Sequence, residues 1–327
     1  MPDPAGSPLF SVVIPTYNRA DDVAAAVGSL LAQDCGDAEL IVVDDRSTDS
    51  TQAALAPYRR PGVKLLLAQR NGGASAARNL GIEAAAGRYV LFLDDDDTLL
   101  PGALDAIRRH FAQHPEIAFS WAGMRLEKQD AAGRLIEACD DLYVPPGDRS
   151  SGMGNLDFVL RIGTNSALCV QREAFDRVGL FDLGLRRSED RDLLLRLAQA
   201  GYRGLPVPQV LVRVQVHTRG SLSRPQGSRM TPDADEAVIA KHRALLQRPE
   251  HRSFLLQYYG NVFELHCDNR HFLPALRYLG VIALRRPSRL GRSLERFLRV
   301  FSGLEWLKER LGYHEWKVRR RMRRSSS

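Results

Sequence analysis

The chain is poor in cysteine and contains no long hydrophobic segment. Its 327 residues include only four cysteines, which lie far apart and form no CxxC pair, so no disulfide framework is expected. The longest apolar runs, at 9–15 and 278–284, reach about seven residues, whereas a membrane-spanning helix needs roughly 20. We therefore expect no transmembrane helix and four reduced, buried and inert thiols.

The sequence also lacks signs of export and of repetition. The first seven residues show neither the basic region nor the long apolar region of a secretory signal. The composition, 44% apolar and 26% charged, is that of an ordinary globular protein, and no internal repeat is present. These features predict one or two globular domains, with the cytoplasm as the default location.

Acidic residues are scarce in the last part of the chain. From residue 271 onward there are 15 Lys and Arg but four Glu, a net charge of +11, so residues 1–270 carry a net charge of −4. From residue 290, apolar residues recur every three or four positions beside a basic face, which is typical of a helix at a membrane surface. The alternative is that this stripe packs against the rest of the protein and the arginines are solvated.

Two kinds of anion could attract such a basic tail, a lipid surface or a nucleic acid. No nucleic-acid recognition module precedes the arginines, and we therefore expect no nucleic-acid partner. A lipid surface would place the protein peripherally on the inner face of the cell membrane.

The first 200 residues alternate between strand and helix patterns. Short β-branched runs predict strands at 10–14, 39–43, 63–67 and 88–93, and longer amphipathic segments predict helices at 22–33 and 74–86. This alternation is typical of an α/β fold with a doubly wound, mostly parallel sheet. Such sheets bind ligands beyond the carboxyl ends of their strands.

A change in composition predicts where this fold ends. A further helix is expected over 190–200 and an extended stretch over 209–216, followed by a turn-rich segment at 221–228. We therefore predict a catalytic domain over residues 1–225 and a helical, basic C-terminal region over residues 226–327.

Four consecutive aspartates, residues 94–97, follow the strand at 88–93. Because adjacent carboxylates repel one another, they must be exposed or neutralised by a cation. Mg²⁺ and Mn²⁺ take oxygen ligands and typically keep waters and phosphate oxygens in their coordination shell. The cluster predicts a metal ion that bridges the protein and a diphosphate, and the alternative is a solvated loop that caps the next helix.

A second acidic pair, Asp44 and Asp45, ends the strand at 39–43. A carboxylate at the end of a strand can accept hydrogen bonds from a nucleoside. Asp, Ser and Thr also cap helices, so this pair alone leaves both interpretations open.

Five motifs, in this order, resemble those of glycosyltransferase family 2. They are residues 11–19 (SVVIPTYNR), 41–51 (IVVDDRSTDST), 71–81 (NGGASAARNLG), 92–97 (FLDDDD) and 188–193 (SEDRDL). The resemblance covers about residues 8–225. It implies a GT-A (Rossmann-like) fold, a nucleotide-sugar donor, a divalent metal ion and inversion at the anomeric carbon.

The resemblance also implies roles for individual donor-site residues. It assigns the nucleoside pocket to Pro15, Tyr17 and Asp45, and the diphosphate to Arg78, whose planar fork matches phosphate oxygens. It assigns Asp94 and Asp95 to the ribose or the metal shell, and Asp96 to the metal itself. Because the motif holds a fourth aspartate, Asp97, its register is open by one residue.

Sugar transfer to a hydroxyl needs a group that removes the proton. The resemblance implies that Asp190 is this base and that Glu189 orients it or contacts the acceptor. The alternative is that both carboxylates only stabilise a helix N-terminus. His217 stands where related proteins can supply a ligand for the metal or the diphosphate, although a lone histidine is more often a surface or packed residue.

We therefore predict a metal-dependent inverting glycosyltransferase, a hexosyl- or N-acetylhexosaminyl-transferase that uses Mn²⁺ or Mg²⁺. The expected donor is a UDP-sugar, and the expected acceptor is a glycan or lipid-linked hydroxyl in bacterial surface polysaccharide or lipopolysaccharide synthesis. One alternative is a sugar-phosphate nucleotidyltransferase, which would need a Gly-rich loop at residues 15–18. The other is a catalytically silent glycan-binding relative, which the retained aspartates disfavour.

Overall fold

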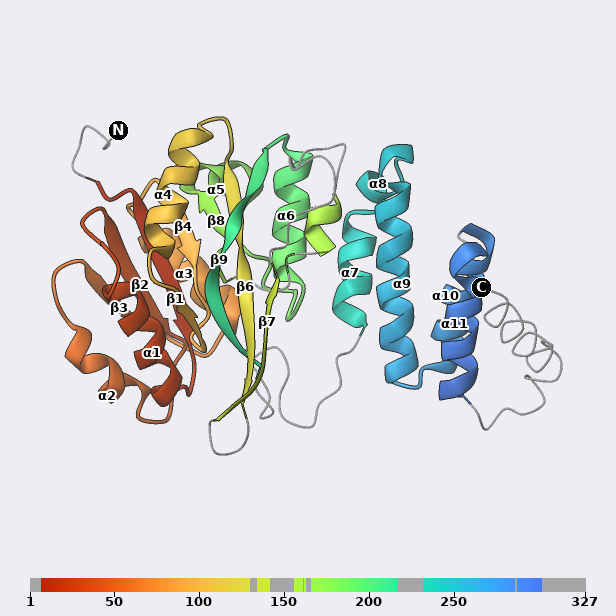
Figure 1. Ribbon diagram of the computed structural model, residues 1–327, viewed down its shortest axis with the longest axis horizontal. Coiled ribbons are helices and arrows are strands. Elements are labelled where there is room, and N and C mark those ends of the chain that lie inside the picture. The colour runs from red at the N-terminus through yellow and green to blue at the C-terminus, as the bar shows by residue number, and fades with distance from the viewer. Residues whose placement is uncertain are drawn as a thin grey trace. The chain divides into compact units, whose positions relative to one another are not determined.

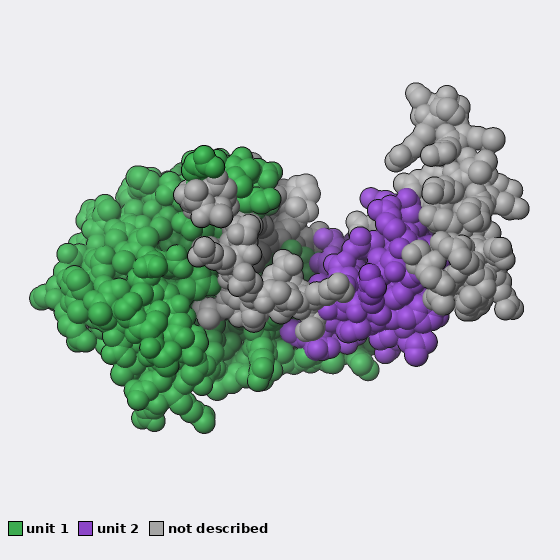
Figure 2. Space-filling model, turned by 90° about the horizontal axis from the view of Figure 1, so that it is seen from below, with its two compact units in different colours: residues 1–228, 237–251 green, residues 229–236, 252–327 purple. Residues whose placement is uncertain are grey.

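The computed structural model describes residues 7–129, 134–141, 156–160, 162, 166–216, 232–285 and 287–301. The chain divides into two compact units (Figure 2). Unit 1 comprises residues 1–228 and 237–251, and unit 2 comprises residues 229–236 and 252–327. The division falls within helix α7 (Asp233–Lys241), so residues 237–251 join unit 1 although they follow the predicted boundary at residue 225.

Four parallel strands form the first half of the sheet in unit 1 (Figure 1). Their order is β3-β2-β1-β4, and their bounds are β1 (Phe10–Thr16), β2 (Ala38–Asp44), β3 (Val63–Leu67) and β4 (Tyr89–Phe92). Helices α1 (Ala20–Leu31), α2 (Thr51–Leu55) and α3 (Ala74–Ala84) connect them, with a 3₁₀ turn at Ala56–Tyr58. The predicted strands and helices of this half are confirmed to within about two residues at each end.

The second half of the sheet is mixed, so the predicted parallel order holds only for the first four strands. Its strands are β5 (Asp97–Leu99), β6 (Phe119–Gln129), β7 (Leu135–Asp141), β8 (Cys169–Gln171) and β9 (Gly204–Val216). The order continues β8-β6-β9-β5, with β7 on β6, and of these pairings only β6–β9 is parallel. Antiparallel neighbours need no crossover helix, so the strand–helix alternation of the first half could not reveal them.

Helices cover both faces of the sheet. On one face, Phe10, Val12 and Ile14 of β1 join the core formed with α1 and α4 (Ala103–Gln113). On the other, Val13 packs so closely against α3 that a methyl group added at Gly81 would overlap it. Helix α5 (Arg172–Val178) lies on this second face, where its Phe175 ring meets the Phe92 ring edge-on at 6.3 Å. Unit 1 also holds a 3₁₀ turn at Asp157–Leu160 and helix α6 (Glu189–Gln199).

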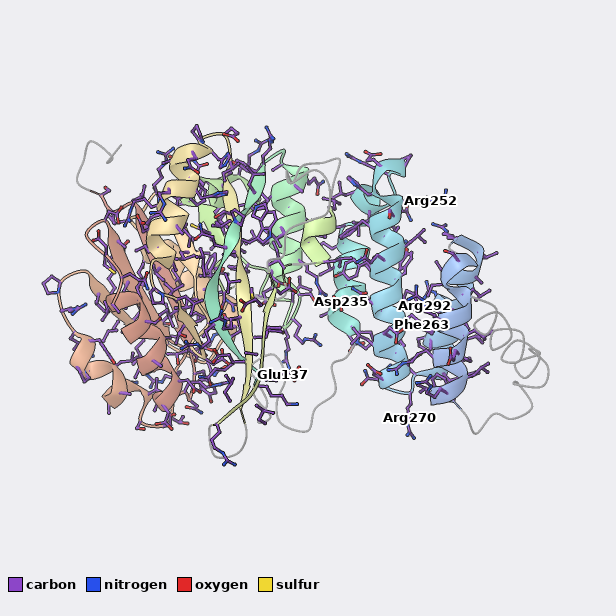
Figure 3. The ribbon with its side chains drawn as sticks, in the orientation of Figure 1. Glu137, Asp235, Arg252, Phe263, Arg270 and Arg292 are labelled. Atoms are coloured by element: carbon purple, nitrogen blue, oxygen red, sulfur yellow. The ribbon has the colours of Figure 1, made fainter. Side chains whose placement is uncertain are left out.

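Unit 2 is a helical bundle, as predicted for the C-terminal region. It contains α9 (Arg252–Asp268), α10 (Phe272–Arg285) and α11 (Pro287–Val300), whereas α8 (Arg243–Leu246) and the 3₁₀ turn Pro249–His251 belong to unit 1. Phe263 of α9 (Figure 3) is buried, and so are Phe297 and Leu298 of α11. Phe297 and Leu298 belong to the apolar stripe predicted from residue 290, so this part of the stripe is core.

The described residues bear on two expectations, one about membrane-spanning helices and one about the cysteines. None of the helices described is long and apolar enough to cross a membrane. The expectation of four buried thiols is wrong in part: Cys169 and Cys267 are buried, but Cys35 is half-buried and Cys139 is exposed on β7. Cys139 is exposed because every residue described on β7 is exposed.

A buried carboxylate, Glu39, ties together the end of the sheet opposite the acidic loop. Its Oε1 accepts hydrogen bonds from the Ser11 hydroxyl (2.6 Å) and the Ala86 N–H (2.7 Å), and its Oε2 lies 2.7 Å from Lys64 Nζ. Burial by itself would raise the pKa of Glu39, but the hydrogen bonds from Lys64, Ser11 and Ala86 outweigh it and the pKa is lowered. Ionised Glu39 therefore stabilises the fold.

We predict that Glu39→Gln lowers the free energy of unfolding by about 1.5–3 kcal/mol at pH 7, because hydrogen bonds to a charged acceptor are lost. The pKa of Glu39 is lower in the folded state than in the unfolded state. The contribution of Glu39 to the free energy of unfolding is therefore complete above its unfolded-state pKa of about 4.3, and it is lost as the pH falls through its folded-state pKa. Urea unfolding of Glu39→Gln at pH 7 and pH 3.5 measures the loss of unfolding free energy at each pH, and Glu137→Gln on exposed β7 (Figure 3) is the control. Equal losses in the two variants would contradict the prediction.

Candidate active site

The four aspartates after β4 form a loop closed by one serine. The Asp94 N–H donates to the Ser166 hydroxyl oxygen (3.1 Å), and that hydroxyl donates to the Asp97 carboxylate. Asp97 then begins β5, opposite Val214 of β9. Ser166 therefore fixes both ends of the loop, and Asp95 and Asp96 lie between them.

Burial strongly perturbs two carboxyl groups of this loop. Burial, together with the neighbouring charge of Asp96, raises the pKa of Asp95 to about 7. Burial and the charges of Asp94 and Asp96 also raise the pKa of Asp97 well above its ordinary value. By distance and angle, Asp95 Oδ2 has no hydrogen-bond partner among the residues described, while the Thr16 hydroxyl lies close enough to this carboxyl to lower its pKa. A buried oxygen of this kind is rare in folded proteins and often marks a position where a ligand or ion binds.

Arg78 on α3 joins the acidic loop to helix α6. Its guanidinium is buried and donates to Asp94 Oδ1 (2.6 Å) and to Glu189 Oε1 (2.9 Å). The Phe181 ring lies against it, with the guanidinium carbon 5.7 Å from the ring centroid. Burial alone would lower the pKa of Arg78, but the charges of Asp94 and Glu189 raise it. The cation therefore stays charged between two carboxylates.

The first turn of α6 carries the two carboxylates predicted to act on the acceptor. Asp190 Oδ1 accepts the backbone N–H of Arg191 (2.7 Å). A bond of this kind is expected if the carboxylate only stabilises the N-terminus of the helix. Glu189 instead pairs with Arg78, and burial raises its pKa while Arg78 opposes that shift. Stabilising a helix end does not require this second contact, which connects α6 to the donor side of the site.

Asp45 holds the backbone that leads into α3. Its two oxygens accept the N–H groups of Gly72 (2.9 Å) and Gly73 (2.7 Å). Burial raises the pKa of Asp45, and these two bonds work against the rise. Gly73 has a φ of +83°, which favours glycine. The motif at residues 71–81 is thus positioned by the motif at residues 41–51.

Arg19 was not predicted as a site residue, yet it contacts the acidic loop. Its Nη1 lies 3.3 Å from Asp96 Oδ2 and 3.1 Å from Asp22 Oδ2. Ser166 and Phe181 were also missed. Their partners lie about 70 to 110 residues away in the sequence, and no spacing pattern links positions so far apart.

The remaining predicted residues are placed as follows. Pro15 is buried in β1, and Tyr17 follows that strand directly and is half-buried. His217 lies outside the described residues. No group of three or more His, Cys, Asp or Glu side chains arranged to hold a metal ion is present in the described part of the chain. Contacts therefore bring together Arg78, Asp94 and Glu189, with Asp190 next to them.

We predict that Arg78→Met lowers the free energy of unfolding by about 3–5 kcal/mol, because it leaves buried carboxylates without their cation. Adding Glu189→Gln to Arg78→Met should recover part of the loss, since one of those charges is removed. Urea unfolding measures both, with Arg108→Met as the control. That substitution breaks the more exposed pair with Asp37, worth about 0–1 kcal/mol. A double variant less stable than Arg78→Met would contradict the prediction.

The chain is similar to known glycosyltransferases. The model of the family "Glycosyl transferase family 2" matches residues 11–179. TuaG of Bacillus subtilis, described as a putative teichuronic acid biosynthesis glycosyltransferase, is 39% identical over 157 residues, covering 47% of this chain and 62% of that protein. WfgD of Escherichia coli, a UDP-Glc:alpha-D-GlcNAc-diphosphoundecaprenol beta-1,3-glucosyltransferase, is 35% identical over 97 residues, covering 30% and 38%.

A solved structure shares the fold along most of its length. The crystal structure of S. aureus TarS in complex with UDP-GlcNAc superposes with a TM-score of 0.63 at 19% identity, covering 93% of this chain and 92% of that one. The family match spans just over half of the chain and includes the acidic loop and Arg78, although it ends before Glu189. The chain therefore belongs to glycosyltransferase family 2 and is a glycosyltransferase with the GT-A fold.

Proposed function

We propose that this enzyme transfers a sugar from a UDP-sugar to a glycan or lipid-linked hydroxyl of the bacterial surface, with inversion at the anomeric carbon and with help from Mn²⁺ or Mg²⁺. The observation that carries the proposal is the buried Arg78, held between Asp94 of the acidic loop and Glu189 of α6. This arrangement puts a phosphate-binding cation next to a pair of carboxylates that can act on an acceptor.

The donor side of the site suits a nucleoside diphosphate. The planar guanidinium of Arg78 is of the kind that matches phosphate oxygens, although in the structure its Nη1 and Nη2 donate to Glu189 and Asp94. Pro15, Tyr17 and Asp45 follow or end the strands at the edge of the sheet where such ligands bind. That TarS was solved with UDP-GlcNAc, and that WfgD is named for UDP-Glc, supports uridine as the nucleoside.

The acidic loop fits a divalent cation in chemistry, though it offers few ligands. Its side chains supply only oxygen atoms, as Mg²⁺ and Mn²⁺ prefer, and Asp95 Oδ2 is buried with no hydrogen bond from the described residues. Asp96, with Asp94 or Asp95, would hold the ion, and we keep His217 as a further proposed ligand. A bound ion would supply positive charge that stabilises the departing diphosphate.

Asp190 is the proposed base. The acceptor oxygen attacks the anomeric carbon from the side opposite the diphosphate, so the new C–O bond forms as the old one breaks and the configuration inverts. Asp190 takes the proton of the acceptor hydroxyl during this step. Glu189, fixed by Arg78, holds the first turn of α6 in place next to the donor.

The proposed acceptor rests on the relatives. TuaG is described for teichuronic acid biosynthesis and WfgD for a diphosphoundecaprenol-linked sugar, which supports a surface glycan or a lipid-linked intermediate. Since the matched regions cover 62% and 38% of those proteins, the acceptor of this chain has to be found by experiment.

Calorimetric titration with UDP, GDP and dTDP, each with and without Mn²⁺, tests the donor. We expect UDP to bind and Mn²⁺ to tighten its binding. If only GDP or dTDP binds, the proposed donor is wrong. If the folded protein binds none of the three, the silent glycan-binding relative becomes the better interpretation. Formation of a nucleotide-sugar from a sugar phosphate and a nucleoside triphosphate would instead favour a nucleotidyltransferase.

We predict that Asp190→Asn lowers the transfer rate about 10²-fold or more while leaving UDP binding nearly unchanged, because the amide cannot accept the acceptor proton. Release of UDP from UDP-glucose and UDP-GlcNAc, with water as the acceptor, measures the rate without knowledge of the natural acceptor. Asp176→Asn on α5, a change of the same size and charge outside the site, is the control. Full activity of Asp190→Asn would remove this residue from the mechanism.

We further propose that unit 2 binds an anionic lipid surface through α10. Leu273, Leu276 and Leu284 lie on one face of this helix, with exposed fractions of 73%, 40% and 87%. The flanking Arg277 and Arg285 are also exposed, and α10 contains no acidic residue. Apolar side chains bordered only by basic ones match a membrane interface, where each Lys or Arg adds about 1 kcal/mol.

The expected result is that Leu273→Gln, Leu276→Gln and Leu284→Gln together abolish co-sedimentation with phosphatidylglycerol vesicles while UDP binding stays unchanged. The matched control replaces Leu135 and Ile136, two exposed apolar residues of β7, with Gln. If vesicle binding persists and the triple substitution instead reduces the sedimentation coefficient, this face joins two copies of the chain and the lipid proposal fails.

A further inference from the structure

A fully buried carboxylate, Asp192, lies one turn after the beginning of α6. Its Oδ1 is 2.8 Å from both His242 Nε2 and Lys241 Nζ, and its Oδ2 accepts a hydrogen bond from Arg196 Nε (2.9 Å). Burial alone would raise the pKa of Asp192, but the hydrogen bonds from His242 and Lys241 and the charge of Arg196 hold it well below the ordinary value. Asp192 is therefore ionised inside the protein.

Its partners extend the cluster to a second segment. Lys241 Nζ also pairs with Asp182 Oδ2 (2.6 Å). The Arg196 guanidinium donates to three consecutive backbone carbonyls, at Val178, Gly179 and Leu180, over 2.5–2.9 Å. The cluster thus fixes helix α6 and the segment 178–182 to the junction of α7 and α8.

Both of these pieces hold Arg78. Segment 178–182 supplies Phe181, whose ring lies against the guanidinium and whose backbone exchanges two hydrogen bonds with the side chain of Asn79, both 2.9 Å long. Helix α6 supplies Glu189, which accepts from Arg78 Nη1. Neither Lys241 nor His242 contacts Arg78 directly, so any influence on it runs through Asp182 and Asp192.

We infer that Lys241 and His242 are positioning residues of the active site, which act through Asp192 and Asp182 to set the first turn of α6 and the Phe181 support of Arg78. The part of this inference that concerns catalysis rests on the proposed function. It gives a positioning role to two residues of the stretch 237–251, which belongs to unit 1 although the sequence predicted it to be part of a separate C-terminal region.

The contacts of Asp192 also explain why Lys241 and His242 can position α6. A single buried carboxylate needs one cation, yet Asp192 has Arg196 from its own helix and two further partners from the α7–α8 junction. Arg196, four residues along the same helix, compensates the charge and ties α6 to the backbone of residues 178–180, but none of these contacts reaches the α7–α8 junction. Lys241 and His242 supply that second anchor, since they come from a different part of the chain.

The decisive variants are His242→Leu and Lys241→Met, with His242→Gln as the conservative replacement that still offers an N–H to Asp192. The matched control is Arg108→Met, which breaks the ion pair between α4 and Asp37, outside the site. We expect the two disruptive variants to slow UDP release from UDP-glucose and UDP-GlcNAc by about 10- to 100-fold at saturating donor, as misplaced catalytic groups do. His242→Gln should keep more of the rate, and the control should keep all of it.

A double-mutant cycle with Asp190→Asn separates positioning from general destabilisation. If Lys241 and His242 act through the first turn of α6, their substitution should add little to the rate loss of Asp190→Asn. A purely structural role predicts a lower melting temperature with an unchanged rate at saturating donor, and this result would overturn the inference.

Hydrogen exchange gives a readout that does not depend on activity. In His242→Leu and Lys241→Met, exchange should increase in peptides that cover residues 178–182 and 188–196, and it should stay unchanged there in Arg108→Met. Unchanged exchange in both segments would overturn the inference. If the wild-type enzyme neither binds UDP nor hydrolyses UDP-sugars, the proposed function fails, while exchange still decides whether Lys241 and His242 hold α6.

Discussion

The charge of Arg78 is the constraint on which the active site depends. Three carboxylates, on Asp94, Glu189 and Asp190, act electrostatically on one buried guanidinium, and a buried charge is tolerated only when it is paired and hydrogen-bonded. The site can therefore assemble only if α3, the acidic loop and α6 all reach their positions. Under the proposed function, a diphosphate that enters this region would meet strong negative charge, and Arg78 and Arg19, which pair with Asp94 and Asp96, are the cations that offset it.

The same rule applies to a second carboxylate of α6, Asp192. Glu189 and Asp192 are three residues apart, so they lie on neighbouring positions of the helix surface, and each is bound to a cation from a different element. Glu189 points to Arg78 and Asp192 to Lys241 and His242. A shift of the helix that improved one set of contacts would lengthen the other. The position of Asp190 between them is thus held by contacts to two other elements, which would suit the fixed geometry that the proposed base needs.

Features determined locally were predictable from the sequence, and features that depend on distant pairing were not. The strands β1 to β4 and the helix at residue 189 follow from periodicity and from motifs whose residues are neighbours in the chain. The partners of Asp96, Asp97 and Asp192 do not, because Arg19, Ser166 and His242 lie 50 to 77 residues away and carry no pattern of their own. The mixed half of the sheet was missed for a related reason, since strands of three residues such as β5 and β8 are too short to show a period.

The net charge of the C-terminal region overstates the number of arginines that unit 2 leaves unpaired by acidic residues. The basic excess after residue 271 suggests a surface entirely available to an anionic partner, yet part of it is neutralised within unit 2. Arg296 pairs with Glu264 (3.1 Å) and Asp268, and Arg299 pairs with Glu295 (3.2 Å). The exposed arginines of the described helices that remain for a lipid surface include Arg292 (Figure 3), Arg277 and Arg285. In the described helices these three charges contribute about 3 kcal/mol, so the leucines of α10 would have to add to the binding there.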